Sequence, residues 1–155
     1  MRTPLMRTPL MRTLGHALLL AAVLTAAAPT VATPTMAAET LYDSLGGQAG
    51  IAAIVRTALE IHVNDPRLAA DLDNINLDRL RSRVAEQLCA LTGGPCTYRG
   101  RPMGAAHAGL VMTQAKFNAF AEGAQAAMEQ LGIPYRTQNR LMALLAPMQR
   151  DIVNH

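Results

Sequence analysis

Apolar residues recur at the spacing of one helix face in each long segment of the chain after residue 40. Ile51, Ile54, Val55 and Ala58 show this spacing in one segment, and glycine or proline separates each segment from the next. No stretch shows the alternation of apolar and polar residues that is typical of a half-buried strand. The pattern therefore predicts an all-α domain with short connections.

The composition also favours helices. Half of the 155 residues are apolar, yet the chain has only 2 Phe, 3 Tyr and no Trp. Ala, Leu and Met must therefore fill the core, and these are strong helix formers. A chain of this length has room for one domain with a substantial core.

Glycine, proline and capping residues mark the expected helix ends. A short first helix stops at Gly46-Gly47, and a second helix ends before Pro66. Thr113 is placed to cap a long helix, and Pro134 to open the last one. The side chains expected to face inward are Ile51, Ile54, Val55, Ala58, Leu59, His62, Leu77, Leu80, Val84, Leu88, Leu91, Phe117, Phe120, Ala121, Ala124, Met128, Leu131, Leu141, Leu144, Leu145 and Met148.

Two segments between these helices are expected to be less regular. Residues 67–76 are predicted to form a polar connection anchored by Leu68 and Leu72. Residues 103–109 are predicted to form a short helix around His107.

Residues 1–38 have the features of a secretory signal peptide. Arg2, Arg7 and Arg12 precede an uncharged run over residues 17–28, and small residues follow up to residue 38. We therefore expect an exported protein, periplasmic or secreted, whose folded domain covers residues 39–155. The alternative is an uncleaved anchor, but the run is short for a membrane span.

The basic bias of the whole chain lies in that leader. The chain has 14 basic and 11 acidic residues, and three of the basic ones precede residue 39. The remaining domain is close to neutral. This argues against nucleic-acid binding, which needs a concentrated basic face.

One histidine, His107, lies among small and apolar residues in the segment 103–113. Neutral imidazole is a common ligand of transition metals, and a haem iron held by one histidine needs an apolar surround. On these residues alone, a histidine packed in the core is the alternative interpretation. The residues on either side of His107 favour its role as a metal ligand, because they belong to a wider pattern.

From about Thr40 to Val153 the chain resembles the group I truncated haemoglobins. The matching residues are Leu41-Tyr42-Asp43-Ser44-Leu45-Gly46-Gly47, Asp65-Pro66-Arg67-Leu68, Arg79-Leu80, Gly93-Gly94-Pro95, Tyr98-Arg99-Gly100, Met103, His107-Ala108-Gly109, Thr113, Phe117, Ala146-Pro147 and Asp151. The resemblance implies a two-over-two helical sandwich around haem, with His107 as the proximal iron ligand. There is no Cys-x-x-Cys-His motif, so we expect haem b.

The resemblance also implies which other residues contact the haem. A basic residue at the position of Arg83 reaches a propionate in this family, while Met103, Met112 and Phe117 would pack on the proximal side of the porphyrin. The positions implied on the distal side are Leu59, Leu72, Leu80 and Val84.

These distal residues depart from the family pattern. The usual tyrosine of the second helix is replaced by Leu59, and the usual polar residues of the third helix by Leu80 and Val84. None of them can donate a hydrogen bond to a ligand. His62 and Gln87 lie near enough in sequence to compensate, although a helix-end contact and a solvated side chain are the ordinary alternatives for them.

Three functions are compatible with this sequence. The first is a haem protein that binds diatomic gases and receives electrons from an unidentified donor. The second is an exported globin-fold module that has lost efficient haem binding and acts as a partner-binding or structural domain. The third is a weak NO dioxygenase or peroxidase, which would need a distal acid–base group such as His62.

Cys89 and Cys96 are the two cysteines of the chain, and we predict that they form a disulfide. Export would send them to an oxidising compartment. Cys89 falls near the opposite side of its helix from the apolar stripe, and Cys96 follows Gly93-Gly94-Pro95, where the chain turns back. A metal site is the alternative, but no histidine lies close to both thiols in sequence.

Overall fold

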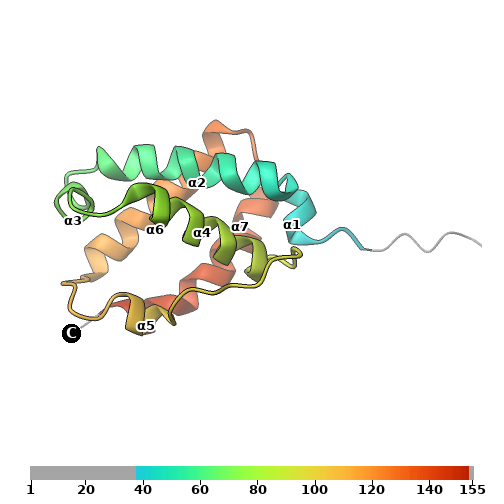
Figure 1. Ribbon diagram of the computed structural model, residues 1–155. Helices are drawn as coiled ribbons and strands as arrows, with labels where there is room; N and C mark the ends of the chain where they lie inside the picture. Colours follow the sequence, from blue (N-terminus) through green and yellow to red (C-terminus); the bar gives the residue numbers. More distant parts are fainter. Residues whose placement is uncertain (1–37, 154–155) are drawn as a thin grey trace, which may run out of the picture. The chain divides into compact units, whose positions relative to one another are not determined.

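The computed structural model describes residues 38–153, which form eight α-helices, one 3-10 helix and no strand (Figure 1). The predicted leader and the predicted cleavage site up to residue 37 lie outside the described residues. No described helix is both long enough and apolar enough to cross a membrane. The elements are α1 (Leu41–Ser44), α2 (Gly47–Val63), α3 (Ala69–Leu72), α4 (Leu77–Leu91), α5 (Met103–Ala106), α6 (Gln114–Gln130), α7 (Tyr135–Leu145), η1 (Ala146–Met148) and α8 (Gln149–Ile152).

Polar side chains cap several of the helices. The side chain of Thr113 accepts a hydrogen bond from the backbone N–H of Lys116 at 3.2 Å, as predicted for the start of α6. Thr40 and Asp43 form a reciprocal capping box at α1. Such caps satisfy backbone donors that the first helical turn leaves unpaired.

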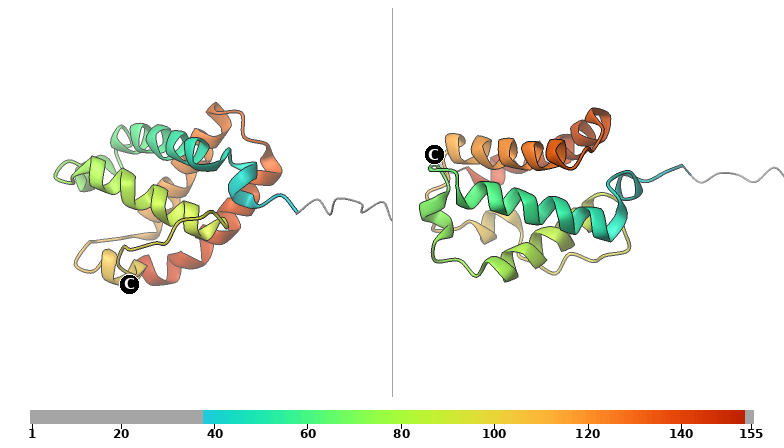
Figure 2. Two further views of the ribbon diagram at one scale, coloured as in Figure 1. Left: turned by 45° about the vertical axis from the view of Figure 1, so that its right-hand side comes forward. Right: turned by 90° about the horizontal axis from the view of Figure 1, so that it is seen from above.

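Helix α2 is the common support of the domain. Helices α4 and α6 both pack extensively on α2, and α7 packs on α6 and α1 (Figure 2). The side chains of Leu45, Ile51, Ile54, Met128 and Leu141 are at most 2% exposed at the centre of these contacts. The apolar stripe predicted for α2 is therefore the centre of the core.

A close approach of two backbone segments joins α1 to α2. A Cβ on Gly50 would lie 1.9 Å from the carbonyl oxygen of Leu45, so no larger residue fits there without a shift of the backbone. Gly46, between them, has a φ of +87°, which L-residues rarely adopt. These glycines bring α1 against α2 and bury Leu45 completely.

Three apolar side chains expected to face inward are instead exposed. Phe120 is 36%, Leu131 is 40% and Leu144 is 38% exposed. The spacing of apolar residues identifies the apolar face of a helix, but it does not show how far along that face the neighbouring helices extend. Leu131 is the C-cap residue of α6, where the helix ends.

The two irregular segments also differ from expectation. The connection at 67–76 contains a one-turn helix, α3, which the polar sequence did not indicate. The predicted helix at 103–109 ends at Ala106, and His107 is its C-cap residue with a φ of −106°. Gly109 has a φ of +80°, so the helix could not have continued to that residue.

The predicted disulfide between Cys89 and Cys96 is confirmed, with the two Cα atoms 5.7 Å apart. The prediction that Cys89 projects away from the core is wrong, because this residue is only 3% exposed. A Cβ on Gly94 would meet both Tyr42 and the sulfur of Cys89. The loop after α4 and helix α1 therefore cover the face of α4 that the helix alone would leave open.

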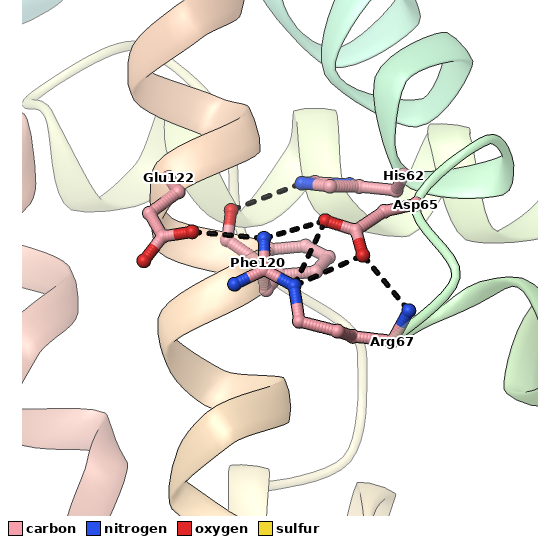
Figure 3. Close-up of polar contacts among 5 residues, drawn as sticks. All are labelled: His62, Asp65, Arg67, Phe120 and Glu122. Atoms are coloured by element: carbon pink, nitrogen blue, oxygen red, sulfur yellow. Dashed lines mark hydrogen bonds and ion pairs between the residues drawn. The ribbon is translucent and has the colours of Figure 1, made fainter.

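His62 is completely buried between α2 and α6 (Figure 3). Its Nε2 donates to the carbonyl oxygen of Phe120 at 2.9 Å, and its ring stacks on that of Phe120 with centroids 4.2 Å apart. A Cβ on Gly123 would lie 2.4 Å from the imidazole, so the glycine makes room for it. Burial lowers the pKa of His62, because the charged ring would lose its hydration.

A salt bridge lies beside this histidine at the surface. The guanidinium of Arg67 pairs with Asp65 at 2.6 Å and with Glu122 of α6 at 2.8 Å (Figure 3). Hydrogen bonds from the side chain and backbone of Arg67 lower the pKa of Asp65 to about 2. The pair links the turn after α2 to α6, although exposed pairs of this kind stabilise a fold only weakly.

We predict that acid destabilises the domain through His62. Its pKa is lower in the folded state than the usual value of about 6.5, so the unfolded chain binds the extra proton first. Stability is therefore lost as the pH falls below about 6.5 towards the folded-state pKa, by up to about 1.4 kcal/mol per pH unit. Urea unfolding at a series of pH values should show a smaller loss in His62→Gln, and equal slopes would contradict the prediction.

We predict that the disulfide stabilises the domain by about 2.5 kcal/mol, because it closes a loop of about eight residues in the unfolded chain. The double variant Cys89→Ser/Cys96→Ser should unfold at correspondingly lower urea concentration. A reductant should destabilise the wild type and leave the double variant unchanged. Two alkylatable thiols on the folded wild-type protein, found by mass spectrometry, would rule the bridge out.

Candidate functional site

The imidazole of His107 is half-buried at the end of α5. Its Nδ1 lies 2.8 Å from the carbonyl oxygen of Met103, one helical turn earlier. A carbonyl can only accept, so Nδ1 carries the proton in this bond. The lone pair of the neutral ring is then on Nε2, the nitrogen available to a metal.

The loop before α5 holds this turn in place from both ends. Its start is tied to α4 by the disulfide. Near its end, the hydroxyl of Tyr98 donates to the carbonyl oxygen of Arg101 at 3.0 Å. Pro102, with a φ of −53°, then leads directly into the single turn of α5.

The side chains predicted for the proximal wall are half-buried rather than packed away. Met103, Met112 and Phe117 all have intermediate exposure. They come from α5, from the loop after His107 and from the first turn of α6. Large apolar side chains remain partly exposed in this way when no neighbouring element covers them completely.

The structure brings three of the four predicted distal residues together in the core. Leu59 is 4% exposed and belongs to the core cluster, and Leu80 and Val84 of α4 pack against that cluster. Leu72, at the end of α3, is half-buried. In the described part of the chain, α4 makes no extensive contact with α6, although both helices pack on α2.

Gln87 extends from α4 towards α5 and η1. Its amide nitrogen lies 3.3 Å from the sulfur of Met103 and 3.7 Å from that of Met148. Gln87 is half-buried, so it is not the fully solvated side chain that was its ordinary alternative. By helical spacing it lies between Leu80 and Leu91, three residues after Val84, and this position could have indicated its inward direction.

Arg83 is at the surface and is oriented by a neighbour on its own helix. Its guanidinium pairs with Glu86 at 2.8 Å, and Glu86 also accepts a hydrogen bond from the backbone N–H of Arg99. These contacts lower the pKa of Glu86, the bond from Arg99 most. The structure thus holds Arg83 beside the loop that leads to α5.

Neither His62 nor Asp71 turns towards the predicted distal wall. His62 uses Nε2 to bind the backbone of α6. Asp71, in α3, pairs with Lys116 at 2.7 Å. Lys116 also donates to the carbonyl oxygen of Val111 at 3.0 Å, so this ion pair links α3 to the loop after His107. The sequence pattern did not predict the ion pair between Asp71 and Lys116, because these residues are far apart in the chain.

A surface cleft of about 530 Å³ lies on another side of α4. Its lining includes Ser82, Ala85 and the disulfide, and it does not include His107. Among the described residues, no group of three or more His, Cys, Asp or Glu side chains is placed to hold a metal ion.

Comparison with known proteins places this arrangement in a family. A sequence model of the bacterial-like globins matches residues 40–154. A group 1 truncated haemoglobin of Nostoc sp. is 30% identical over 74% of this chain and 98% of its own length. The group 1 truncated haemoglobin GlbN of Mycolicibacterium paratuberculosis is 27% identical over 73% of this chain and 83% of its own.

Solved structures agree with the sequence comparison. Truncated haemoglobin from Tetrahymena pyriformis, in its Fe(III) form, superposes with a TM-score of 0.72 at 26% identity, covering 75% of this chain and 99% of that one. THB1 of Chlamydomonas reinhardtii superposes with a TM-score of 0.65 at 27% identity, covering 77% and 100%. The predicted truncated-globin fold class is thereby confirmed. The chain belongs to the bacterial-like globin family, in agreement with its predicted resemblance to the group 1 truncated haemoglobins.

Proposed function

We propose that this protein is a haem-binding globin that binds diatomic gases, such as O2, NO and CO, next to an apolar distal wall. Membership of a globin family implies a haem cofactor. The observation that carries the proposal is the hydrogen bond from Nδ1 of His107 to Met103. In the neutral ring this bond places the proton on Nδ1 and the lone pair on Nε2, which is the tautomer in which histidine binds a haem iron.

The residues around His107 fit such a group. When bound, haem supplies an iron with one coordination position for a diatomic ligand. The half-buried side chains of Met103, Met112 and Phe117 offer apolar surface for one side of the ring, and Leu72, Leu80 and Val84 for the other. Burial of this surface would favour binding by about 25 cal/mol for each Å² of apolar surface removed from water.

Arg83 is our candidate partner for a propionate. The side chain of Arg83 is 45% exposed and its guanidinium is already oriented by Glu86, so it could exchange or share that carboxylate partner at little cost. Cys89 and Cys96 bind each other, which leaves neither thiol for a covalent link to a cofactor. Non-covalent haem b is the form that these residues support.

The distal wall determines how a ligand would be held. Leu59, Leu80 and Val84 carry no hydrogen-bond donor, and Leu59 stands where related chains have a tyrosine. A hydrogen bond to a polarised ligand contributes roughly 1.5–3 kcal/mol. Its loss would speed oxygen release by tenfold or more, while ligands that need no donor would be affected less.

The position of His62 argues against peroxidase chemistry. A peroxidase needs a distal group that exchanges protons with the substrate. His62 was the candidate for that role, but it is fully buried and its Nε2 donates to Phe120. Binding of a diatomic ligand does not require a proton-exchanging group on α2.

We also propose that the protein acts outside the reducing cytoplasm. The support is the disulfide together with the leader-like segment before residue 39. Stable disulfides are typical of the periplasm and of secreted proteins.

We predict that His107→Gly abolishes stable haem binding. Protein purified from a haem-replete host should show a Soret band in the wild type and lose it in the variant. Added imidazole should restore the band, because it can occupy the space that the side chain leaves. Wild-type haem content and an unchanged ferrous spectrum in His107→Gly would contradict the assignment, and a wild type without haem would favour the alternative of a module that has lost haem binding.

We predict that Leu59→Tyr slows oxygen dissociation from the ferrous protein by tenfold or more, as one new hydrogen bond would. Leu59→Phe is the matched control, because it adds the ring without the hydroxyl and reports any effect of crowding in this buried position. Stopped-flow kinetics should separate the two variants. Equal rates in both would mean that position 59 does not face the ligand.

A further inference from the structure

Gln87 connects three elements that meet beside His107. Its backbone belongs to α4, and its amide nitrogen lies within hydrogen-bonding distance of the sulfurs of Met103 in α5 and Met148 in η1. The loop from 92 to 102 separates α4 from α5 in sequence, so this contact is a direct link across it. Gln87 is half-buried there, on the same side of α4 as Leu80 and Val84.

An amide is an unusual choice for this position if packing is its only role. Thioether sulfur is a weak acceptor, so the contacts with Met103 and Met148 repay little of the cost of taking an amide out of water. A leucine or methionine at residue 87 would fill a similar volume without that cost. What the amide adds is direction, because an N–H donor forms a hydrogen bond only when it points at an acceptor.

Met103 transmits this direction to the imidazole. Its side chain accepts from Gln87 at 3.3 Å, and its carbonyl oxygen accepts from Nδ1 of His107 at 2.8 Å. Helix α5 has only four residues, and one turn has little rigidity of its own. The carbonyl oxygen of Met103 also accepts from the backbone N–H of His107 at 3.1 Å, and the contact with Gln87 holds the side chain of the same residue.

We infer that Gln87 is a positioning residue for His107, which it orients through Met103. The inference rests on the proposed function for its meaning, since the oriented Nε2 is the nitrogen proposed to bind iron. Outer-shell hydrogen-bond partners of this kind orient a metal-ligating imidazole and tune the metal that it binds. Gln87 thus couples the distal helix α4 to the proximal ligand.

The variant that tests this is Gln87→Met, which keeps the volume and removes the donor. In the haem-free protein, NMR should show faster exchange of the Nδ1 proton of His107, on the order of fivefold, as expected for a weakened hydrogen bond. Backbone amides of α2 and α6 should keep their protection. Gln130→Met is the matched control, because Gln130 is exposed at the end of α6.

A second readout uses the haem-loaded protein. The iron–histidine stretching band in resonance Raman spectra should move to lower frequency in Gln87→Met, because the imidazole becomes a weaker donor. Met103→Leu should produce the same shift, and combining the two variants should add little, since both remove one interaction.

The haem-free measurement decides the inference by itself. An unchanged Nδ1 exchange rate in Gln87→Met would overturn it, as would a loss of protection shared by the α2 and α6 amides, because either result would make Gln87 a packing residue only. A wild-type protein that takes up no haem would contradict the proposed function and leave this measurement valid.

Discussion

The packing of α4 and α6 on one shared helix, α2, is the constraint on which the rest of the structure depends. Both helices make their largest contacts there and little with each other. The fully buried side chains gather around α2, while the apolar residues of α4 and α6 farther from it stay half-buried. The core is thus complete on one side and leaves apolar surface uncovered on the other, where His107 lies.

The long helices could be predicted from the sequence because their signals are local. The spacing of Ile51, Ile54 and Val55 and the cap at Thr113 are properties of one segment each. Helix α3 and the end of α5 were missed or misplaced because a helix of one turn has almost no periodicity. Its existence depends on tertiary contacts, such as the ion pair between Asp71 and Lys116.

The features of the candidate site also fall into those that the sequence could predict and those that it could not. His107 and the pairing of Cys89 with Cys96 followed from local sequence and from the family resemblance. The burial of Cys89 did not, since helical spacing describes a helix alone and not the loop that folds over it. The roles of His62 and Gln87 also needed the structure, because their partners are 58 and 16 residues away in the chain.

His62 and Gln87 have one feature in common that bears on ligand binding. Each is a polar side chain close to the apolar distal wall, and each directs its donor to the protein rather than towards a ligand. His62 holds α2 to α6, and Gln87 holds α4 to the turn that carries His107. On the proposed function, a distal wall with Leu59 and without a hydroxyl donor would select ligands by size and apolar contact alone. The remaining means of tuning a bound iron would then be the imidazole of His107, which is hydrogen-bonded to Met103.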